Sequence, residues 1–170
     1  MFEVLVFVYE NYWRGEACPE LPQLGRKLSA AGFDPDEIQQ ALAWLDGLNL
    51  AARDTRLADG APLPERSGIP LQQTPPTQPS AQSLRVYSVA EQSHLGAECL
   101  GFICFLESAG VLPPVLREIV LDRAMAVAGR PMRLDDLKII VLMVYWSFGT
   151  EPDALVLDEL CDDHRDRVAH

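Results

Sequence analysis

The feature of the sequence that most constrains its fold is an apolar stretch at residues 134–148, LDDLKIIVLMVYWSF. Residues 139–146 form an unbroken apolar run that falls far short of the roughly 20 residues needed to cross a bilayer. Periodicity alone allows a buried strand here, but Asp135 and Asp136 favour a helix start and Gly149 favours a helix end. We therefore predict a helix of about four turns. Because it is apolar on every side, we expect it to be the central core helix.

Residues 1–53 have the spacing of three short amphipathic helices. The first ends at Gly15, and its apolar stripe consists of Phe2, Leu5, Val6, Tyr9, Tyr12 and Trp13. The second covers residues 20–31, with inward side chains from Leu21, Leu24 and Leu28. The third closes near residues 48–50, and its inward face consists of Ile38, Leu42 and Leu45, with Ala41 and Trp44 beside them.

The turn between the second and third helices carries clear local signals. Gly32 is placed to take the left-handed conformation after a helix, with Phe33 as the accompanying hydrophobic contact. Asp34, Pro35 and Glu37 then supply an N-cap, a proline at the first helical position and an acid two positions later. Three short helices with such a turn predict a helix-turn-helix-like unit.

Residues 54–83 differ in composition from the rest of the chain. They contain six of the thirteen prolines and no aromatic residue, with many Gln, Thr and Ser. Because such a segment buries little apolar surface, we predict a disordered proline-rich linker, with a polyproline ligand for a partner domain as the alternative. The alternating residues 84–88 then predict a short strand that pairs with residues 50–53 as the wing of a winged helix.

Residues 89–162 have the pattern of a helical bundle. Ser88 and Glu91 form a capping box at the start of a long helix. The inward stripe of this helix is Leu95, Cys99, Phe102, Ile103 and Leu106, and a second apolar face is formed by Leu100 and Phe105. Two apolar faces are typical of a helix packed on two sides. A helix opening at Pro113, the central helix and a last amphipathic helix after Thr150 follow, before the acidic tail at residues 163–170.

Together these patterns predict a mainly α fold with about seven helices in two units. The N-terminal trihelical unit, residues 1–53, resembles a winged helix in its spacing, with residues 84–88 as the wing. The C-terminal unit is a helical bundle wrapped around residues 134–148.

A trihelical unit raises the question of DNA binding through its third helix. The candidate basic contacts are Arg26, Lys27, Arg53 and Arg85. However, the chain has 25 acidic and 14 basic residues, a net charge of -11, and such a balance repels a phosphate backbone. The residues at the start of the would-be recognition helix are acidic as well: Asp34, Asp36 and Glu37. We therefore expect a compact scaffold that does not bind nucleic acid.

The titratable residues do not form a catalytic pattern. The sequence has no glycine-rich phosphate loop, nucleophile elbow or zinc pattern. Only His164, within the acidic tail, has surroundings that resemble a metal site, and a solvated charged segment is the simpler interpretation. The cysteines Cys18, Cys99, Cys104 and Cys161 show no C-x-x-C pairing, so we expect them to behave as small hydrophobes. We predict no enzymatic activity, no cofactor and no metal site.

The N-terminal stretch MFEVLVFVYENYW is apolar but does not have the features of a signal peptide. It contains Glu3 and Glu10, and it lacks both a basic start and a small-residue cleavage site. Since no stretch is long enough to span a bilayer either, we expect a cytoplasmic protein with no membrane association.

Three tryptophans, Trp13, Trp44 and Trp146, lie on three different predicted helices. Large aromatic side chains of this kind usually anchor a core or an interface between units. The alternative is that Trp13 is exposed and contacts a partner protein.

Several blocks of the sequence resemble the bacterial Smg protein family. They are Met1-Phe2-Glu3-Val4-Leu5, Asn11-Tyr12-Trp13, the segment 28–48 that ends Trp44-Leu45-Asp46-Gly47-Leu48, Gly101-Phe102, Phe105-Leu106-Glu107, Leu134-Asp135-Asp136-Leu137-Lys138 and Val141-Leu142-Met143-Val144. The resemblance leaves out residues 54–83, a longer insertion than expected of the family. It implies a small, soluble, largely helical proteobacterial protein, with a gene near those of a DNA-processing protein and a topoisomerase-like protein. It implies no particular activity and transfers no site residues.

These observations favour a non-catalytic adaptor that binds another protein, and the resemblance implies a role in bacterial nucleic-acid metabolism. The alternative function is a winged-helix nucleic-acid-binding protein. A basic stripe formed in three dimensions by the four candidate residues would favour this alternative. The sequence identifies neither the partner nor the oligomeric state.

Overall fold

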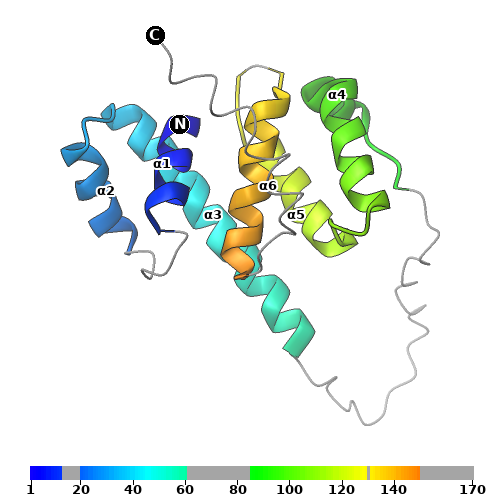
Figure 1. Ribbon diagram of the computed structural model, residues 1–170, viewed down its shortest axis with the longest axis horizontal. Coiled ribbons are helices and arrows are strands. Elements are labelled where there is room, and N and C mark those ends of the chain that lie inside the picture. The colour runs from blue at the N-terminus through cyan, green and yellow to red at the C-terminus, as the bar shows by residue number, and fades with distance from the viewer. Residues whose placement is uncertain (13–19, 61–84, 130, 150–170) are drawn as a thin grey trace, which may run out of the picture.

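The computed structural model describes residues 1–12, 20–60, 85–129 and 131–149 of the chain. All regular secondary structure in these ranges is helical (Figure 1), which confirms the mainly α prediction. The helices are α1 (Phe2–Tyr12), α2 (Leu21–Ala30), α3 (Pro35–Gly60), α4 (Val89–Ser108), α5 (Pro114–Met125) and α6 (Leu134–Phe148). The helix predicted after Thr150 and the acidic tail at residues 163–170 lie outside the described residues.

Helix α6 is the centre of the fold, as predicted from its apolar run. All of residues 136–145 are buried, and the helix packs against α1, α3, α4 and α5. In Figure 1 it stands between α1 and α3 on one side and α4 on the other. Asp135 and Asp136 occupy its first turn, and Gly149 ends it in the left-handed conformation with φ of 66°. The acidic start and the glycine end that favoured a helix over a strand are thus both confirmed.

The two units predicted from the sequence share one hydrophobic core. Helix α3 packs on α5 as well as on α6, and buried side chains from all six helices form a single cluster. Trp44 of α3 is buried, and its indole Nε1–H donates a hydrogen bond of 3.0 Å to the carbonyl oxygen of Arg123 in α5. Near this contact the guanidinium of Arg123 lies against Gly47, in the space that a Cβ atom there would occupy. The N-terminal helices are therefore not a separate body.

The turn between α2 and α3 has the predicted geometry. Gly32 has φ of 92°, and its N–H donates to the carbonyl oxygen of Ser29 at 3.1 Å. The N–H of Phe33 donates to the carbonyl oxygen of Leu28 at 3.3 Å, which completes a Schellman motif. The Phe33 ring packs edge-on against Phe7 of α1, with 5.3 Å between ring centroids. This contact fixes the α2–α3 turn against the first helix.

The start of α3 is capped as expected, with one difference in detail. The Asp34 carboxylate accepts a hydrogen bond of 2.9 Å from the N–H of Asp36. Glu37 was expected to serve this cap, but its carboxylate accepts from the N-terminal ammonium of Met1 at 2.8 Å. This ion pair joins the start of the chain to the start of α3.

Helix α3 is longer than predicted. It continues to Gly60, so residues 54–60, which were assigned to the linker, are helical. The physical reason is that no proline lies between Pro35 and Pro62, while alanine, leucine and arginine favour continuation of the helix. The remainder of the predicted linker, residues 61–83, lies outside the described residues.

The predicted wing is wrong for the residues that the structure describes. Residues 50–53 lie within α3 and so are not available to pair as a strand, and residues 85–88 are irregular. The guanidinium of Arg85 hydrogen-bonds to Glu91 at the start of α4 and to Glu118 on α5. These bonds hold residues 85–88 against two helices rather than beside α3.

Helix α4 starts at the predicted capping box and contains a break that the sequence pattern did not reveal. The Ser88 hydroxyl accepts from the N–H of Glu91 at 3.2 Å, and the Glu91 carboxylate accepts from the N–H of Ser88 at 2.7 Å. At Gly96 the backbone leaves the helical conformation, with φ of 70° and ψ of 173°. Just before the break, the carbonyl oxygen of His94 accepts a 2.7 Å hydrogen bond from the N–H of Met132. The break therefore lies where the segment leading into α6 docks on α4.

The second face of α4 is packed only in part, because Leu100 is half-buried against the core whereas Phe105 is exposed. Phe105 is 56% exposed and stacks on Phe102, with 6.5 Å between ring centroids. Among the described residues, the helices that pack mainly on α4 are α5 and α6, and Figure 1 shows α4 at the outer edge of the group of helices.

We predict that Gly96→Ala destabilises the fold by about 1–3 kcal/mol, because φ near +70° with an extended ψ is a conformation reserved almost entirely for glycine. Gly101→Ala, in the helical part of α4 with open space around its Cβ position, is the matched control. It should be neutral or stabilise by about 0.5–1 kcal/mol. Urea unfolding followed by circular dichroism measures both, and equal effects of the two substitutions would contradict the break at Gly96.

Candidate functional site

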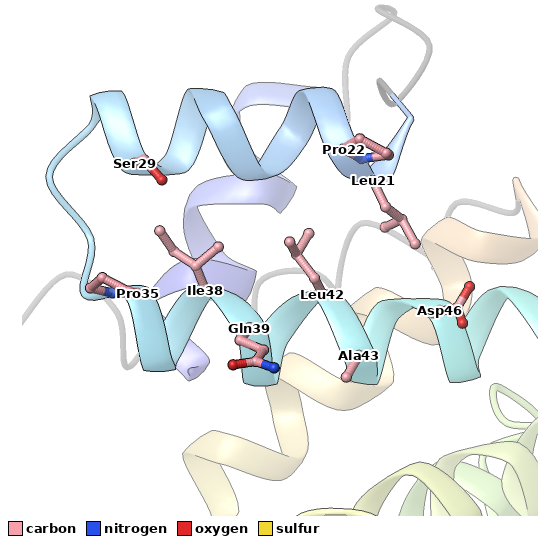
Figure 2. Close-up of a pocket in the computed structure, with 9 residues that line it drawn as sticks. All are labelled: Leu21, Pro22, Ser29, Pro35, Ile38, Gln39, Leu42, Ala43 and Asp46. Carbon is pink, nitrogen blue, oxygen red and sulfur yellow. The ribbon is translucent and has the colours of Figure 1, made fainter.

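The candidate functional site is an open groove of about 600 Å³ between α2 and α3 (Figure 2). Most of its lining is apolar. The lining residues are Leu21, Pro22, Ser29, Pro35, Ile38, Gln39, Leu42, Ala43 and Asp46. The sequence analysis did not predict this groove.

The apolar floor of the groove comes from both helices. Figure 2 shows Ile38 and Leu42 pointing from α3 towards α2, and Leu21 pointing from α2 towards α3. Leu21 and Leu42, both expected to lie inward, are only half-buried. Gly25 sets the spacing of the helices, because a Cβ atom there would lie 3.1 Å from Cδ1 of Leu42. The groove is thus a shallow depression along the line where the two helices are in close contact.

Exposed carboxylates flank the groove at both ends. Asp46 lies at the end marked by Leu21 in Figure 2, and the exposed Glu20 directly precedes Leu21 in the chain. Pro35 marks the other end in Figure 2, and the exposed Asp34 and Asp36 flank it in the chain. One basic residue, Arg26, follows Pro22 by one turn on α2 and is exposed on the same side of that helix. The described surroundings of the groove are therefore mainly acidic.

A second polar cluster lies across the molecule, where residues 85–88 meet α4 and α5. Arg85 donates hydrogen bonds to Glu91 at 2.8 Å and to Glu118 at 3.0 Å. Arg117, itself buried, bonds to Glu118 at 2.8 Å and to Glu107. The hydrogen bond from Arg85, together with that from the backbone of Ser88, lowers the pKa of Glu91 to about 2. Its partners raise the pKa of Arg85, and Arg85 likewise lowers the pKa of Glu118.

The four basic residues considered for nucleic-acid contact do not gather into one stripe. Arg26 and Lys27 are exposed on α2, where the Lys27 ammonium lies 5.2 Å from the centre of the Tyr12 ring. Arg53 is exposed on α3. Arg85 pairs with two carboxylates beside α4, and Figure 1 places α2 and α4 at opposite ends of the molecule. The basic stripe that would favour a nucleic-acid-binding function is not formed by these residues.

The tryptophans divide between the described and undescribed parts of the chain. Trp44 is a buried anchor between α3 and α5, as expected, and Trp146 is half-buried against the core. Trp13, the candidate partner contact, lies outside the described residues.

The cysteines are mixed in their environments. Cys99 is buried as predicted, and burial raises the pKa of its thiol to about 11. Cys104 is instead exposed, 3.8 Å from the hydroxyl of Tyr87. Cys18 and Cys161 lie outside the described residues. In the described ranges, no group of three or more His, Cys, Asp or Glu side chains is arranged to hold a metal ion. Nor is any helix there long and apolar enough to cross a membrane.

Comparison with known proteins gives matches along the whole chain. The family described as "Protein of unknown function (DUF494)" matches residues 1–170. A "Protein Smg homolog" of Leptothrix cholodnii is 56% identical over 170 residues, and one of Methylibium petroleiphilum is 54% identical, each alignment covering 100% of both chains. One of Aromatoleum aromaticum is 44% identical over 169 residues, covering 99% of this chain and 97% of the relative. No solved structure matches the chain.

These alignments confirm the resemblance found in the sequence and correct one detail of it. Because the first two relatives align over their full length, residues 54–83 have a counterpart in each of them. The segment is therefore not an insertion peculiar to this chain.

We predict that Glu91→Gln lowers the free energy of unfolding by about 1–2 kcal/mol at pH 7, because it removes the charge that Arg85 and the start of α4 hold. The pKa of Glu91 is lowered from 4.5 to about 2 in the folded protein. The stabilisation is therefore present above about pH 4.5 and is lost as the pH falls towards 2. Urea unfolding at a series of pH values should show the gap between variant and parent closing in this window.

Glu98→Gln is the control for this prediction, since Glu98 is exposed on the same helix. It should change the free energy of unfolding by no more than about 0.5 kcal/mol. If the difference in free energy of unfolding between Glu91→Gln and the parent stays constant from pH 7 to pH 3, the effect comes from the hydrogen-bond geometry of the cap rather than from its charge.

Proposed function

The chain belongs to the DUF494 family of Smg homologues, and on that premise we propose that it is a non-catalytic adaptor that binds another protein through the α2–α3 groove. The observation that carries this proposal is the groove itself, an open and mainly apolar trough on the outer part of the helical core. The family resemblance favours a partner from bacterial nucleic-acid metabolism.

The chemistry of the lining supports a protein partner over a small molecule. Small-molecule sites usually enclose most of the ligand and hold it with a few convergent polar groups. Here the trough is open, and its polar lining consists of Ser29, Gln39 and Asp46, which are spread along its length. An open groove of this kind is better matched to a segment of a macromolecule than to a small molecule, which would be left largely uncovered.

The charges near the groove support a protein partner over nucleic acid. Carboxylates at both ends of the groove repel phosphates, and Arg85 is held by Glu91 and Glu118 at the far side of the molecule. We expect no salt-dependent binding of duplex DNA at low ionic strength. Binding that is lost when Arg26 and Lys27 are changed to alanine would favour the nucleic-acid alternative instead.

We predict that Ser29→Lys abolishes capture of a partner protein. Ser29 is exposed and points into the groove, so a lysine there places a long charged side chain in the trough. The substitution should fold normally, because lysine in the last turn of a helix is favourable. The measurement is affinity capture from a native bacterial lysate with quantitative mass spectrometry, and a groove-dependent partner should fall at least tenfold.

Ser108→Lys is the matched control for this experiment. Ser108 is also an exposed serine in the last turn of its helix, and like Ser29 it hydrogen-bonds to a carbonyl oxygen of that helix. This control should capture the same proteins as the parent. If the parent and both variants capture identical sets of proteins, the groove is not the docking site.

A further inference from the structure

We propose that the occupant of the α2–α3 groove is an amphipathic helix of the partner protein, with basic residues flanking its apolar stripe. This inference rests on the proposed function and specifies the chemistry of the partner. It is carried by the shape of the groove, the composition of its lining and the charges at its two ends.

The walls of the groove favour a helical occupant. Both walls are helices, so their backbone groups are bonded internally, and the described residues offer no strand edge for an extended peptide to pair with. A polyproline segment normally docks on aromatic side chains, and the residues that line this groove include none. A helix satisfies its own backbone and needs only apolar side-chain contacts from the groove.

The length of the groove fits two turns of such a helix. From Pro35 to Asp46 the α3 wall is about 16 Å long, from the rise of an α-helix. Anchor residues at i, i+3 or i+4, and i+7 span about 10 Å, so three of them fit between the ends of this wall. They would meet Ile38, Leu42 and Leu21, which point into the gap.

The apolar surface continues past the Asp46 end of the groove. Leu50 is 61% exposed and lies one turn beyond Asp46 on the same side of α3. A fourth anchor, one turn further along the partner helix, would cover it. The proposed occupant is therefore a helix of about three turns.

Charge complementarity sets the sign of the flanking residues. Asp46 lines the groove and is exposed, and Glu20 is exposed directly before Leu21 in the chain. Asp34 and Asp36 are exposed on either side of Pro35, the lining residue at the other end. Glu37 is excluded from this set because it pairs with the N-terminal ammonium of Met1. Arg26 is the one exposed cation on the groove side of α2 within the described residues, since Lys27 lies over the Tyr12 ring.

The rim therefore attracts lysine or arginine at both ends of the occupant, and the net charge of -11 steers a basic segment towards the protein at long range. A partner helix with acidic flanks would meet like charge at each end and bind more weakly.

The test uses synthetic helices as probes. The first is a fluorescein-labelled peptide of about 18 residues, long enough to be partly helical, with leucines at i, i+3, i+7 and i+10 and lysines flanking this stripe. Further peptides replace every lysine by glutamate, scramble the leucine stripe at constant composition, or carry a central proline that breaks the helix. Fluorescence anisotropy with the full chain should give at least tenfold tighter binding for the first peptide than for each of the others.

Variants of the chain locate the binding. Ser29→Lys should weaken the binding of the lysine peptide at least tenfold, and Ser108→Lys should leave this affinity unchanged. Asp46→Lys should weaken it about three- to tenfold, as expected when an exposed attractive pair becomes repulsive. Glu98→Lys, the same charge reversal at an exposed site on α4, should weaken it less than twofold.

Several outcomes would overturn the inference. Equal binding of the scrambled peptide would show that charge attraction alone causes the binding. Equal binding of the proline peptide would show that the occupant need not be helical. Equal binding of the glutamate peptide would show that the groove does not select basic flanking residues. Self-association of the parent that Ser29→Lys abolishes would assign the groove to a second copy of the chain.

Different results would contradict the inference and the proposed function. If lysate capture depends on Ser29 while the lysine peptide does not bind the groove, the adaptor function stands and the proposed partner chemistry is wrong. If neither experiment responds to Ser29→Lys, both are wrong.

Discussion

The burial of α6 on every side is the constraint on which the rest of the structure depends. A helix without a polar face must be enclosed, and α1, α3, α4 and α5 are the helices that pack on it. Helix α2 has no place in that enclosure and packs mainly on α3. It therefore projects from the core as one arm of a hairpin, and among the described residues no other helix covers the line where it meets α3. The groove thus follows from the packing of the other helices on α6, which places them away from the line between α2 and α3.

The parts of the fold that could be predicted from the sequence are those governed by local chemistry. A left-handed glycine at residue 32, a capping box at Ser88 and an apolar run with an acidic start each act within a few residues. The end of α3 was missed because nothing between residues 50 and 60 stops a helix, and an apolar pattern that fades was read as an end. The break at Gly96 gave no signal, since a single glycine is tolerated within a helical pattern and the docking of Met132 is a long-range event.

The candidate site was beyond prediction for a related reason. Helical periodicity identifies which side chains are apolar but not which of them another element will cover. Leu21 and Leu42 have the same sequence signature as buried Leu24 and Leu28, and only the path of α2 leaves them half-exposed. Phe105 is a further example, because its apolar pattern predicts packing and the side chain is exposed. Residual exposure is a property of the assembled fold.

The carboxylates around the groove differ in how far the fold itself explains them. Asp34 caps α3 and Asp36 lies in its first turn, so both favour the helix through its dipole whatever the protein binds. Asp46 lies in the middle of α3, where aspartate is a poor helix former and gains nothing from the dipole. Asp46 therefore carries a small cost in helix propensity that the helix dipole does not offset. Among these acids, Asp46 is the one that the formation of α3 does not explain, and the proposed contact with a basic partner helix would account for it.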